Sequence, residues 1–486
     1  MRRPFALVVL CVAVLLLAGC QAPGSPASQT EPGDTDLTPS EPATDYGTNG
    51  SAPPAPATDR LGYENGYWYN ESLSVTTEDG LNETEREAVV ARTMARVERI
   101  RGLEFEETVP VSVVSRAEYR NNTGGDETGE SLRRFDNAKF EALFFIGEDR
   151  DSIAVQNSNR GESVLGYYSS QRGEIVIVSE SETPAISRGT LAHELVHALQ
   201  DQHFGLGSDA RTRDQVQGRN GMVEGDAVAV TQTYTDRCGE AWRCIDRPAQ
   251  SGGGGGDRHF GINFMQYFPY SDGPGLIGDL RERGGWSAVN DAYDDYPDGA
   301  AEVTYPGRYP EWEPESVSLA DRSSDDWERV RPSTDRDRPD YAVVGPSAIA
   351  GSMAYTIADD YNESSVVQTR DVINYEDGSL DSDDPYNYDL PATDGWAGGR
   401  MHVYDNGDET AYVWKTTWDS EADAREFADA WEAVIAHWGG TRTAEGHWAI
   451  EEGSPYTDAV AVKVDGDTVT VVNAPTADEL DEVHDA

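Results

Sequence analysis

The stretch GTLAHELVHALQDQHF (189–204) holds three of the eight histidines of this 486-residue chain, and it decides the fold that we expect. Residues 193–197, HELVH, fit the pattern HExxH. Four residues advance an α-helix by about 400°, so His193 and His197 lie about 40° apart on one face, with Glu194 beside them. Two imidazoles and a carboxylate on one helix face predict a site for a divalent metal ion.

The flanks of this stretch support a helix. Thr183-Pro184 provides a cap and a first helical position, and Gly205 ends the helix. The apolar stripe consists of Leu191, Leu195, Ala198 and Leu199. The alternative to a metal site is two surface histidines on an ordinary amphipathic helix. A chain of this composition is expected to contain roughly 0.01 HExxH matches by chance, which disfavours that alternative.

A catalytic zinc ion needs a third protein ligand and a fourth position for water, and two residues compete for the ligand role. His203 lies ten residues after His193, the spacing of HExxHxxGxxH, but Gln200 stands where that pattern has its glycine. On a continuous helix His203 points about 240° away from His197. Glu224, 27 residues after His197, is the other candidate. The alternative explanation of Glu224 is an acidic helix N-terminus, which the helix dipole favours.

A glutamate at the start of a second helix, after HExxH and a loop, resembles the gluzincin arrangement of zinc peptidases such as thermolysin. The stretches TLAHELVHALQDQHF, MVEGDA and FMQYFPYSDGP also resemble a group of secreted zinc-peptidase-like proteins over about residues 105–310. This resemblance implies Glu224 rather than His203 as third ligand, within a core that has an upstream sheet and a downstream helical subdomain. The chain departs from thermolysin-like enzymes at Val228, where they carry an aspartate; Asp226, if helical, points about 200° away from Glu224.

The charge of the chain is strongly acidic. Asp and Glu number 89 against 38 Lys and Arg, which gives a net charge of −51, and the lysines are Lys139, Lys415 and Lys463 alone. Such a surface repels itself at low salt, whereas near 1 M salt the screening length falls to roughly 3 Å. The composition therefore indicates a salt-adapted protein and gives no sign of a nucleic-acid partner. A disordered acidic chain is disfavoured by 11 Trp and 23 Tyr.

The beginning of the chain has the layout of an export signal. Residues 1–20 comprise a basic start, an apolar run and small residues before Cys20. LAGC at 17–20 resembles a lipobox, which implies a lipid on Cys20, and Arg2-Arg3 resembles a twin-arginine signal. With the acidic composition, these features resemble a haloarchaeal surface lipoprotein, lipid-anchored outside the cell.

With Cys11 in the signal and Cys20 as the lipid site, two cysteines remain in the mature domain, Cys238 and Cys244. Outside the cell they are able to close a small disulfide loop, and their five-residue gap is unlike the CxxC of a zinc site. Two free thiols are the alternative.

Composition and turn signals divide the chain into five parts. They are a signal peptide (1–20), a flexible stalk rich in Pro and Ser (21–58), a zinc-peptidase-like domain (59–311), a polar linker (312–340) and a C-terminal α+β module (341–486).

Periodicity predicts the elements of these parts. We expect helices over 82–101, 135–147 and 420–438, strands over 108–115 and 173–181, short helices within 260–297, and hairpins around Asn406-Gly407 and Asp465-Gly466. We also expect the 173–181 strand to bind an extended peptide by edge pairing.

The sequence thus predicts an α+β fold with a gluzincin-like core and a smaller C-terminal module. The function that we expect is hydrolysis of peptide bonds at the cell surface by a Zn²⁺-activated water, with His193, His197 and Glu224 as ligands and Glu194 as general base. No spacing selects the group that stabilises the oxyanion. The alternatives are a zinc-stabilised binding lipoprotein without turnover and a zinc hydrolase of another amide.

Overall fold

The structure is a computed structural model of the chain. It describes residues 55–75, 79–123, 128–161, 164–181, 183–245, 258–332, 339–359, 361, 364–376, 378–381, 384–451 and 453–485. The expected signal peptide with its lipidation site Cys20, and the stalk up to residue 54, lie outside the described residues. No helix of the described part is long and apolar enough to cross a membrane.

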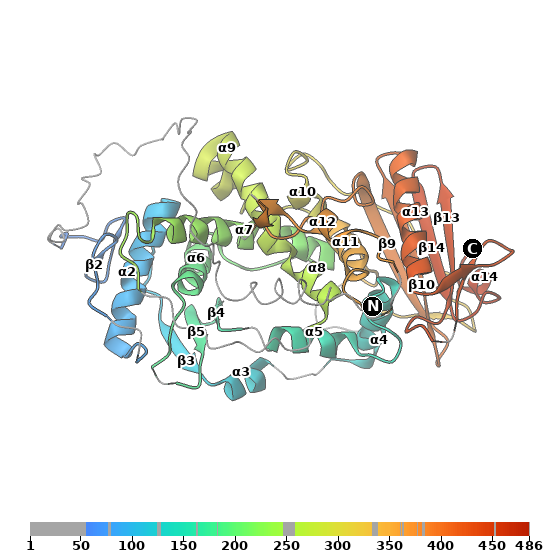
Figure 1. Ribbon diagram of the computed structural model, residues 1–486, viewed down its shortest axis with the longest axis horizontal. Coiled ribbons are helices and arrows are strands. Elements are labelled where there is room, and N and C mark those ends of the chain that lie inside the picture. Colours follow the sequence, from blue (N-terminus) through green and yellow to red (C-terminus); the bar gives the residue numbers. More distant parts are fainter. Residues whose placement is uncertain are drawn as a thin grey trace. The chain divides into compact units, whose positions relative to one another are not determined.

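The chain forms two compact units, each assembled from separate stretches of sequence. The first comprises residues 1–116, 165–203 and 230–253, and the second 117–164, 204–229 and 254–486. Both combine helices with sheets, so the fold class is α+β (Figure 1). The domains predicted from composition, by contrast, are each one continuous stretch of sequence. Their boundaries stay a prediction.

The first unit contains a long helix, a small sheet and a short hairpin. Its elements are β1 (Tyr63–Glu64), β2 (Tyr67–Trp68), α2 (Glu83–Arg101), β3 (Val111–Val114), β4 (Gly166–Ser169), β5 (Glu174–Val178), α6 (Arg188–Phe204) and the last turns of α7 (Arg213–Arg237). Asn82 and Glu85 form a capping box at the start of α2, and Gly102 ends it with a φ of 76°. Helix α2 therefore matches the predicted 82–101.

Helix α6 carries the HExxH residues, but it begins later than the sequence indicated. The expected cap at Thr183-Pro184 is wrong, because these residues lie before the helix and the Pro184 carbonyl accepts from Leu81 N at 3.2 Å. The Ser187 carbonyl accepts instead from Leu191 N at 2.9 Å and starts the helix. Gly205 ends it with a φ of 71°, as predicted.

The three-stranded sheet of the first unit has the order β3-β5-β4. Strand β5 pairs in parallel with β3 and antiparallel with β4. The prediction that this strand offers an edge to an extended peptide is therefore wrong, because both of its edges are hydrogen-bonded. The outer strands are β3 and β4.

Helix α7 begins well before Glu224, so the expectation that this residue starts a second helix is also wrong. Thr212 and Gln215 form a capping box: Gln215 N donates to Thr212 Oγ1, and Thr212 N donates to Gln215 Oε1, both at 3.2 Å. Glu224 consequently lies near the middle of α7, where an N-terminal dipole does not explain a glutamate.

The second unit contains most of the remaining elements. Its helices are α3 (Arg116–Thr123), α4 (Glu130–Ala142), α5 (Ser152–Gly161), α8 (Phe260–Ser271), α9 (Gly273–Asp291), α10 (Ala300–Thr304), α11 (Pro346–Tyr355), α12 (Thr369–Val372), α13 (Glu421–His437) and α14 (Leu480–Val483). Its strands are β6 (Glu328–Arg329), β7 (Tyr375–Glu376), β8 (Ser379–Leu380), β9 (Trp396–Asp405), β10 (Thr410–Trp418), β11 (Gly440–Arg442), β12 (Trp448–Ile450), β13 (Ala459–Asp465) and β14 (Thr468–Ala474).

An antiparallel sheet of order β11-β12-β13-β14-β10-β9-β6 dominates this unit. The expected hairpins join β9 to β10 and β13 to β14. Helix α13 lies along the sheet (Figure 1), and Trp414 of β10 packs its ring 4.9 Å from that of Trp431. Leu319 and Trp327, from the stretch interpreted as a linker, lie in the core that covers the sheet.

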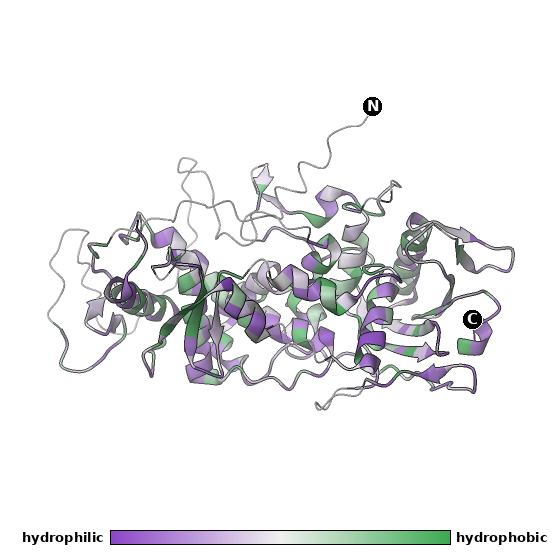
Figure 2. Ribbon diagram, turned by 90° about the horizontal axis from the view of Figure 1, so that it is seen from below, coloured by the Kyte–Doolittle hydropathy of each residue, from purple (hydrophilic) through white to green (hydrophobic). Residues whose placement is uncertain are grey.

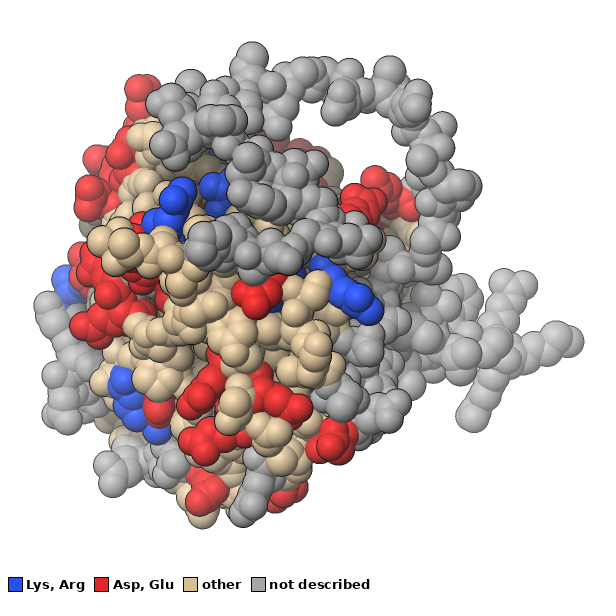
Figure 3. Space-filling view, turned by 90° about the vertical axis from the view of Figure 1, so that its left-hand side faces the viewer, with Lys and Arg blue, Asp and Glu red and all other residues tan. Residues whose placement is uncertain are grey.

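Acidic side chains gather on one face of the described part. Figure 3 shows several groups of Asp and Glu on one face, with few Lys and Arg among them. Hydrophilic and hydrophobic residues are mixed along the ribbon (Figure 2).

Candidate functional site

The two histidines of HExxH face one another on α6. Their Nε2 atoms are 3.2 Å apart, and their rings are nearly perpendicular. Two ligand nitrogens that each lie about 2.1 Å from a tetrahedral Zn²⁺ are separated by about 3.4 Å. His193 and His197 therefore already have nearly the separation that a shared zinc ion requires.

Gln200, one turn after His197, fixes the protonation of that histidine. Its Oε1 lies 2.8 Å from His197 Nδ1, and its side chain is buried. Because an amide oxygen can only accept, Nδ1 carries the proton and Nε2 keeps its lone pair. Sequence reasoning noted Gln200 only as the residue that replaces a glycine, although its i+3 position already placed it beside His197.

Glu194 is buried beside the histidines, with 9% of its surface exposed. Its Oε2 accepts a hydrogen bond from the backbone N–H of Tyr168 at 2.8 Å. This N–H belongs to the outer strand β4, so the sheet fixes the carboxylate from outside its own helix. The hydroxyl of Tyr168 donates to Asp201 Oδ2 at 2.8 Å, which ties β4 to α6 a second time.

Glu224 joins the two histidines in one group. A carboxylate oxygen of Glu224 and one ring nitrogen of each of His193 and His197 all lie within 4.8 Å of one another. All three residues are half-buried. Two neutral imidazole nitrogens and one carboxylate oxygen are a donor set that suits zinc and leaves a fourth tetrahedral position.

His203, the competing third ligand, makes a different contact. Its Nε2 lies 2.7 Å from the carbonyl oxygen of Glu104, beyond the end of α2. This bond holds the last turn of α6 against the segment that precedes β3. The geometry thus agrees with a helix-end histidine, which was the alternative interpretation of His203.

Asp226 is completely buried on α7 and accepts a hydrogen bond from the Tyr293 hydroxyl at 2.7 Å. Tyr293 follows α9, so this bond fixes α7 two residues from Glu224. Sequence reasoning found no such role, because nothing in the spacing of the two residues relates Asp226 to Tyr293.

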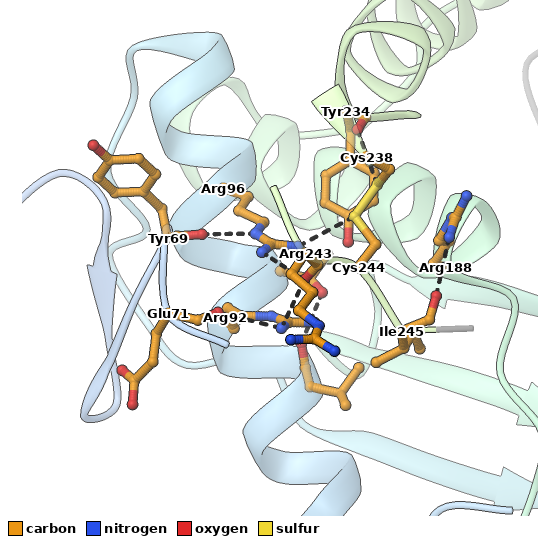
Figure 4. The surroundings of a disulfide bond; sticks show 12 residues. Tyr69, Glu71, Arg92, Arg96, Arg188, Tyr234, Cys238, Arg243, Cys244 and Ile245 are labelled. Carbon is orange, nitrogen blue, oxygen red and sulfur yellow. Dashed lines mark hydrogen bonds between the residues drawn. A yellow bond between two sulfur atoms is a disulfide. The ribbon is translucent and has the colours of Figure 1, made fainter. Parts of the chain in front are cut away.

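Cys238 and Cys244 form a disulfide that closes a loop after α7 (Figure 4). Arg96 of α2 donates to Cys244 Sγ at 3.4 Å and to the Arg243 carbonyl at 3.1 Å, and Arg92 donates to the same carbonyl at 3.2 Å. Both guanidinium groups are buried, and burial lowers the pKa of Arg92 to about 10. The bonds hold the disulfide loop against α2.

The disulfide loop also reaches the helix of the site. Arg188, the first residue of α6, donates to the carbonyl of Ile245 at 3.0 Å, next to Cys244 (Figure 4). The loop thus anchors the start of the helix that carries HExxH.

Comparison with known proteins finds a match in the C-terminal part of the chain. Residues 328–484 match a domain of unknown function (DUF8575). The match starts at β6 and covers the seven-stranded sheet with α13, and it does not include the HExxH helix. No curated protein and no solved structure matches the chain.

Proposed function

We propose that this protein is a zinc-dependent peptidase whose metal ligands are His193, His197 and Glu224. The observation that carries the proposal is the 3.2 Å separation of the two Nε2 atoms beside a buried Glu194. The gluzincin-like core implied by the sequence resemblance belongs to the same proposal. A bound Zn²⁺ would supply a Lewis acid and lower the pKa of a coordinated water to about 7.

The residues of the chain have distinct roles in this reaction. Glu194 takes the proton of the attacking water and passes it to the leaving amine, so that proton transfer starts and ends on one carboxylate. The Tyr168 N–H holds that carboxylate in place. Gln200 keeps the proton of His197 on Nδ1 and so leaves Nε2 for the metal.

A carboxylate next to two histidines favours turnover over a purely structural site. A structural zinc site is closed by four protein ligands and has no need of a base. The group here offers three ligands, and Glu194 is beside them rather than among them.

The test combines metal analysis with a peptide panel, in high salt because the net charge is −51. We expect the wild type to bind one zinc ion per chain and to cleave at least one peptide. E194Q should keep the zinc and lose activity by about 10²-fold or more, since only the base is removed. E224A should lose most of the zinc.

H203A is the matched control, because it removes a histidine of the same helix that contacts a carbonyl instead. We expect it to keep the zinc of the wild type. Full metal in E224A with loss in H203A would overturn the ligand assignment. Zinc binding without cleavage of any peptide would favour a zinc-stabilised binding lipoprotein. Cleavage of non-peptide amides alone would favour a zinc hydrolase of another amide.

We also propose that the protein is a surface lipoprotein tethered through Cys20. The support is the sequence of residues 1–20, which resembles a lipobox signal. In cell fractionation, the wild type should sediment with membranes and C20S should not. Recovery of both in the same fraction would contradict the tether.

A further inference from the structure

Helix α2 buries two arginines side by side next to the disulfide loop. Arg92 is 2% exposed and Arg96 is fully buried, and four residues of helix place both on one face. Asp and Glu outnumber Lys and Arg by 89 to 38 in this chain. Among the residues that the structure describes, however, neither guanidinium forms an ion pair with a carboxylate. We call these two residues the arginine pair.

Arg96 has neutral partners for all of its nitrogens. Its Nε donates to the Tyr69 carbonyl at 2.7 Å, its Nη1 to Cys244 Sγ at 3.4 Å and its Nη2 to the Arg243 carbonyl at 3.1 Å. The Trp242 ring lies 5.0 Å from its guanidinium carbon. The hydrogen-bonding capacity of Arg96 is therefore met without an anion.

Arg92 differs, because only one of its three nitrogens is satisfied. Its Nη1 donates to the Glu71 carbonyl at 3.3 Å and to the Arg243 carbonyl at 3.2 Å. Its Nε and Nη2 are buried and, within the described part of the chain, have no hydrogen-bond partner. These two nitrogens form one edge of the planar guanidinium, the edge that binds an anion through two parallel N–H bonds. Buried donors without an acceptor are costly, so this edge calls for a ligand.

The charges around Arg92 favour an anionic ligand. Burial, and then the charge of Arg96, lower the pKa of Arg92 to about 10, and Tyr234 and Glu71 oppose this. Arg92 is still charged at neutral pH. The Glu71 side chain points away from it, because Glu71 contributes its carbonyl instead (Figure 4). Two buried positive charges therefore lie together, and a buried charge without a counter-ion is strongly unfavourable.

We propose that the Nε–Nη2 edge of Arg92 binds a chloride ion. The edge supplies two parallel N–H donors, and one negative charge offsets one of the two charges of the arginine pair. Because only 2% of Arg92 is exposed, the site suits a single atom rather than a phosphate or a carboxylate-bearing molecule. A chain of net charge −51 that needs salt for screening also meets chloride at high concentration.

The ion would stabilise a junction of three segments. Nη1 of Arg92 already joins the carbonyls of Glu71, after the β1–β2 hairpin, and of Arg243, in the disulfide loop, to α2. Chloride would offset the charge of the guanidinium that makes this junction. Salt would then act on this protein at one defined site, in addition to the screening of its acidic surface.

The test compares thermal unfolding of the full chain in NaCl and in sodium gluconate at the same concentration, so that screening is equal. With chloride at about a hundred times its dissociation constant, we expect a Tm roughly 3–5 °C higher in NaCl for the wild type. R92M should lose most of this difference. In gluconate R92M should be at least as stable as the wild type, because an apolar side chain replaces a buried charge.

R243Q is the matched control. The Arg243 side chain is exposed, and the substitution keeps the carbonyl that both members of the arginine pair contact. R243Q should therefore respond to chloride like the wild type. If R92M does not fold, R92K keeps the charge but lacks the paired N–H edge, and its Tm should require about tenfold more chloride to rise.

Crystals of the full chain grown in NaBr locate the ion directly. Bromide replaces chloride and scatters anomalously, so we expect a peak in contact with Nε and Nη2 of Arg92. The proposal is overturned by bromide crystals without a peak at this edge, or by a difference between NaCl and gluconate that is equal in R92M and the wild type. Equal Tm values of the wild type in the two salts would overturn it as well.

Discussion

Gly225, the residue after Glu224, should not tolerate even a methyl group. A Cβ built on it lies 2.4 Å from both the carbonyl carbon and the oxygen of Gly273, the first residue of α9. In turn, a Cβ on Gly273 would lie 2.4 Å from the Gly221 carbonyl oxygen. The two helices therefore touch backbone to backbone, and G225A requires them to separate by about 1 Å, because ordinary contacts begin at 3.4 Å.

The expected cost follows from two opposing terms. Overpacking of this kind costs typically 1–3 kcal/mol, whereas Gly to Ala inside a helix gains about 1 kcal/mol. The net result is a loss of stability of roughly 0–2 kcal/mol in G225A relative to the wild type. G278A is the matched control on α9, since nothing lies within 4 Å of its added Cβ, and it should gain roughly 0.5–1 kcal/mol.

Urea unfolding in high salt, followed by tryptophan fluorescence, measures both variants. Zinc affinity provides a second measurement, because displacement of α7 would move Glu224, the proposed third ligand. We expect G225A to bind zinc more weakly and G278A to bind it as the wild type does. If G225A proves as stable as G278A, the close packing of α7 on α9 is not what fixes the helix.

Three other perturbations test separate parts of the structure. Burial raises the pKa of Asp214 to about 7, so the stability that its protonated form contributes is present below pH 4 and is lost as the pH rises to 7. Over that range the free energy of unfolding of the wild type should fall relative to that of D214N, by at most about 1.4 kcal/mol per pH unit. A difference between the two proteins that does not change with pH would contradict this. Q200A should bind zinc roughly 10-fold more weakly with unchanged helicity by circular dichroism, and unaltered affinity would remove the orienting role of Gln200. The C238S/C244S double variant should unfold at lower urea concentration, with a loss of about 2 kcal/mol for so short a loop, and an unchanged midpoint would show that the arginines of α2 hold the loop without the disulfide.

Much of the local structure could be predicted from the sequence. Helix α2 covers the range that periodicity predicted, and the Asn-Gly and Asp-Gly turns marked both hairpins of the large sheet. These features depend on hydrogen bonds and dihedral preferences within a few residues, which a sequence contains directly.

Where the predictions were wrong, a distant segment took part. The sequence predicted a helix start at Pro184. Its carbonyl accepts from the backbone N–H of Leu81 instead, and α6 begins at Arg188. The 173–181 strand was expected to be an edge, but β3 and β4 pair with both of its sides. The capping box at Thr212 and Gln215 was available in the sequence and would have located the start of α7.

The sequence by itself determined that His193, Glu194 and His197 share one helix face, because the 3.6-residue repeat of the backbone fixes that placement without any other part of the chain. Tertiary structure decided what surrounds them: the Tyr168 N–H on Glu194, and the carboxylate of Glu224 near the histidines. Contacts between segments far apart in sequence depend on how sheets and helices pack, and no local pattern encodes that packing.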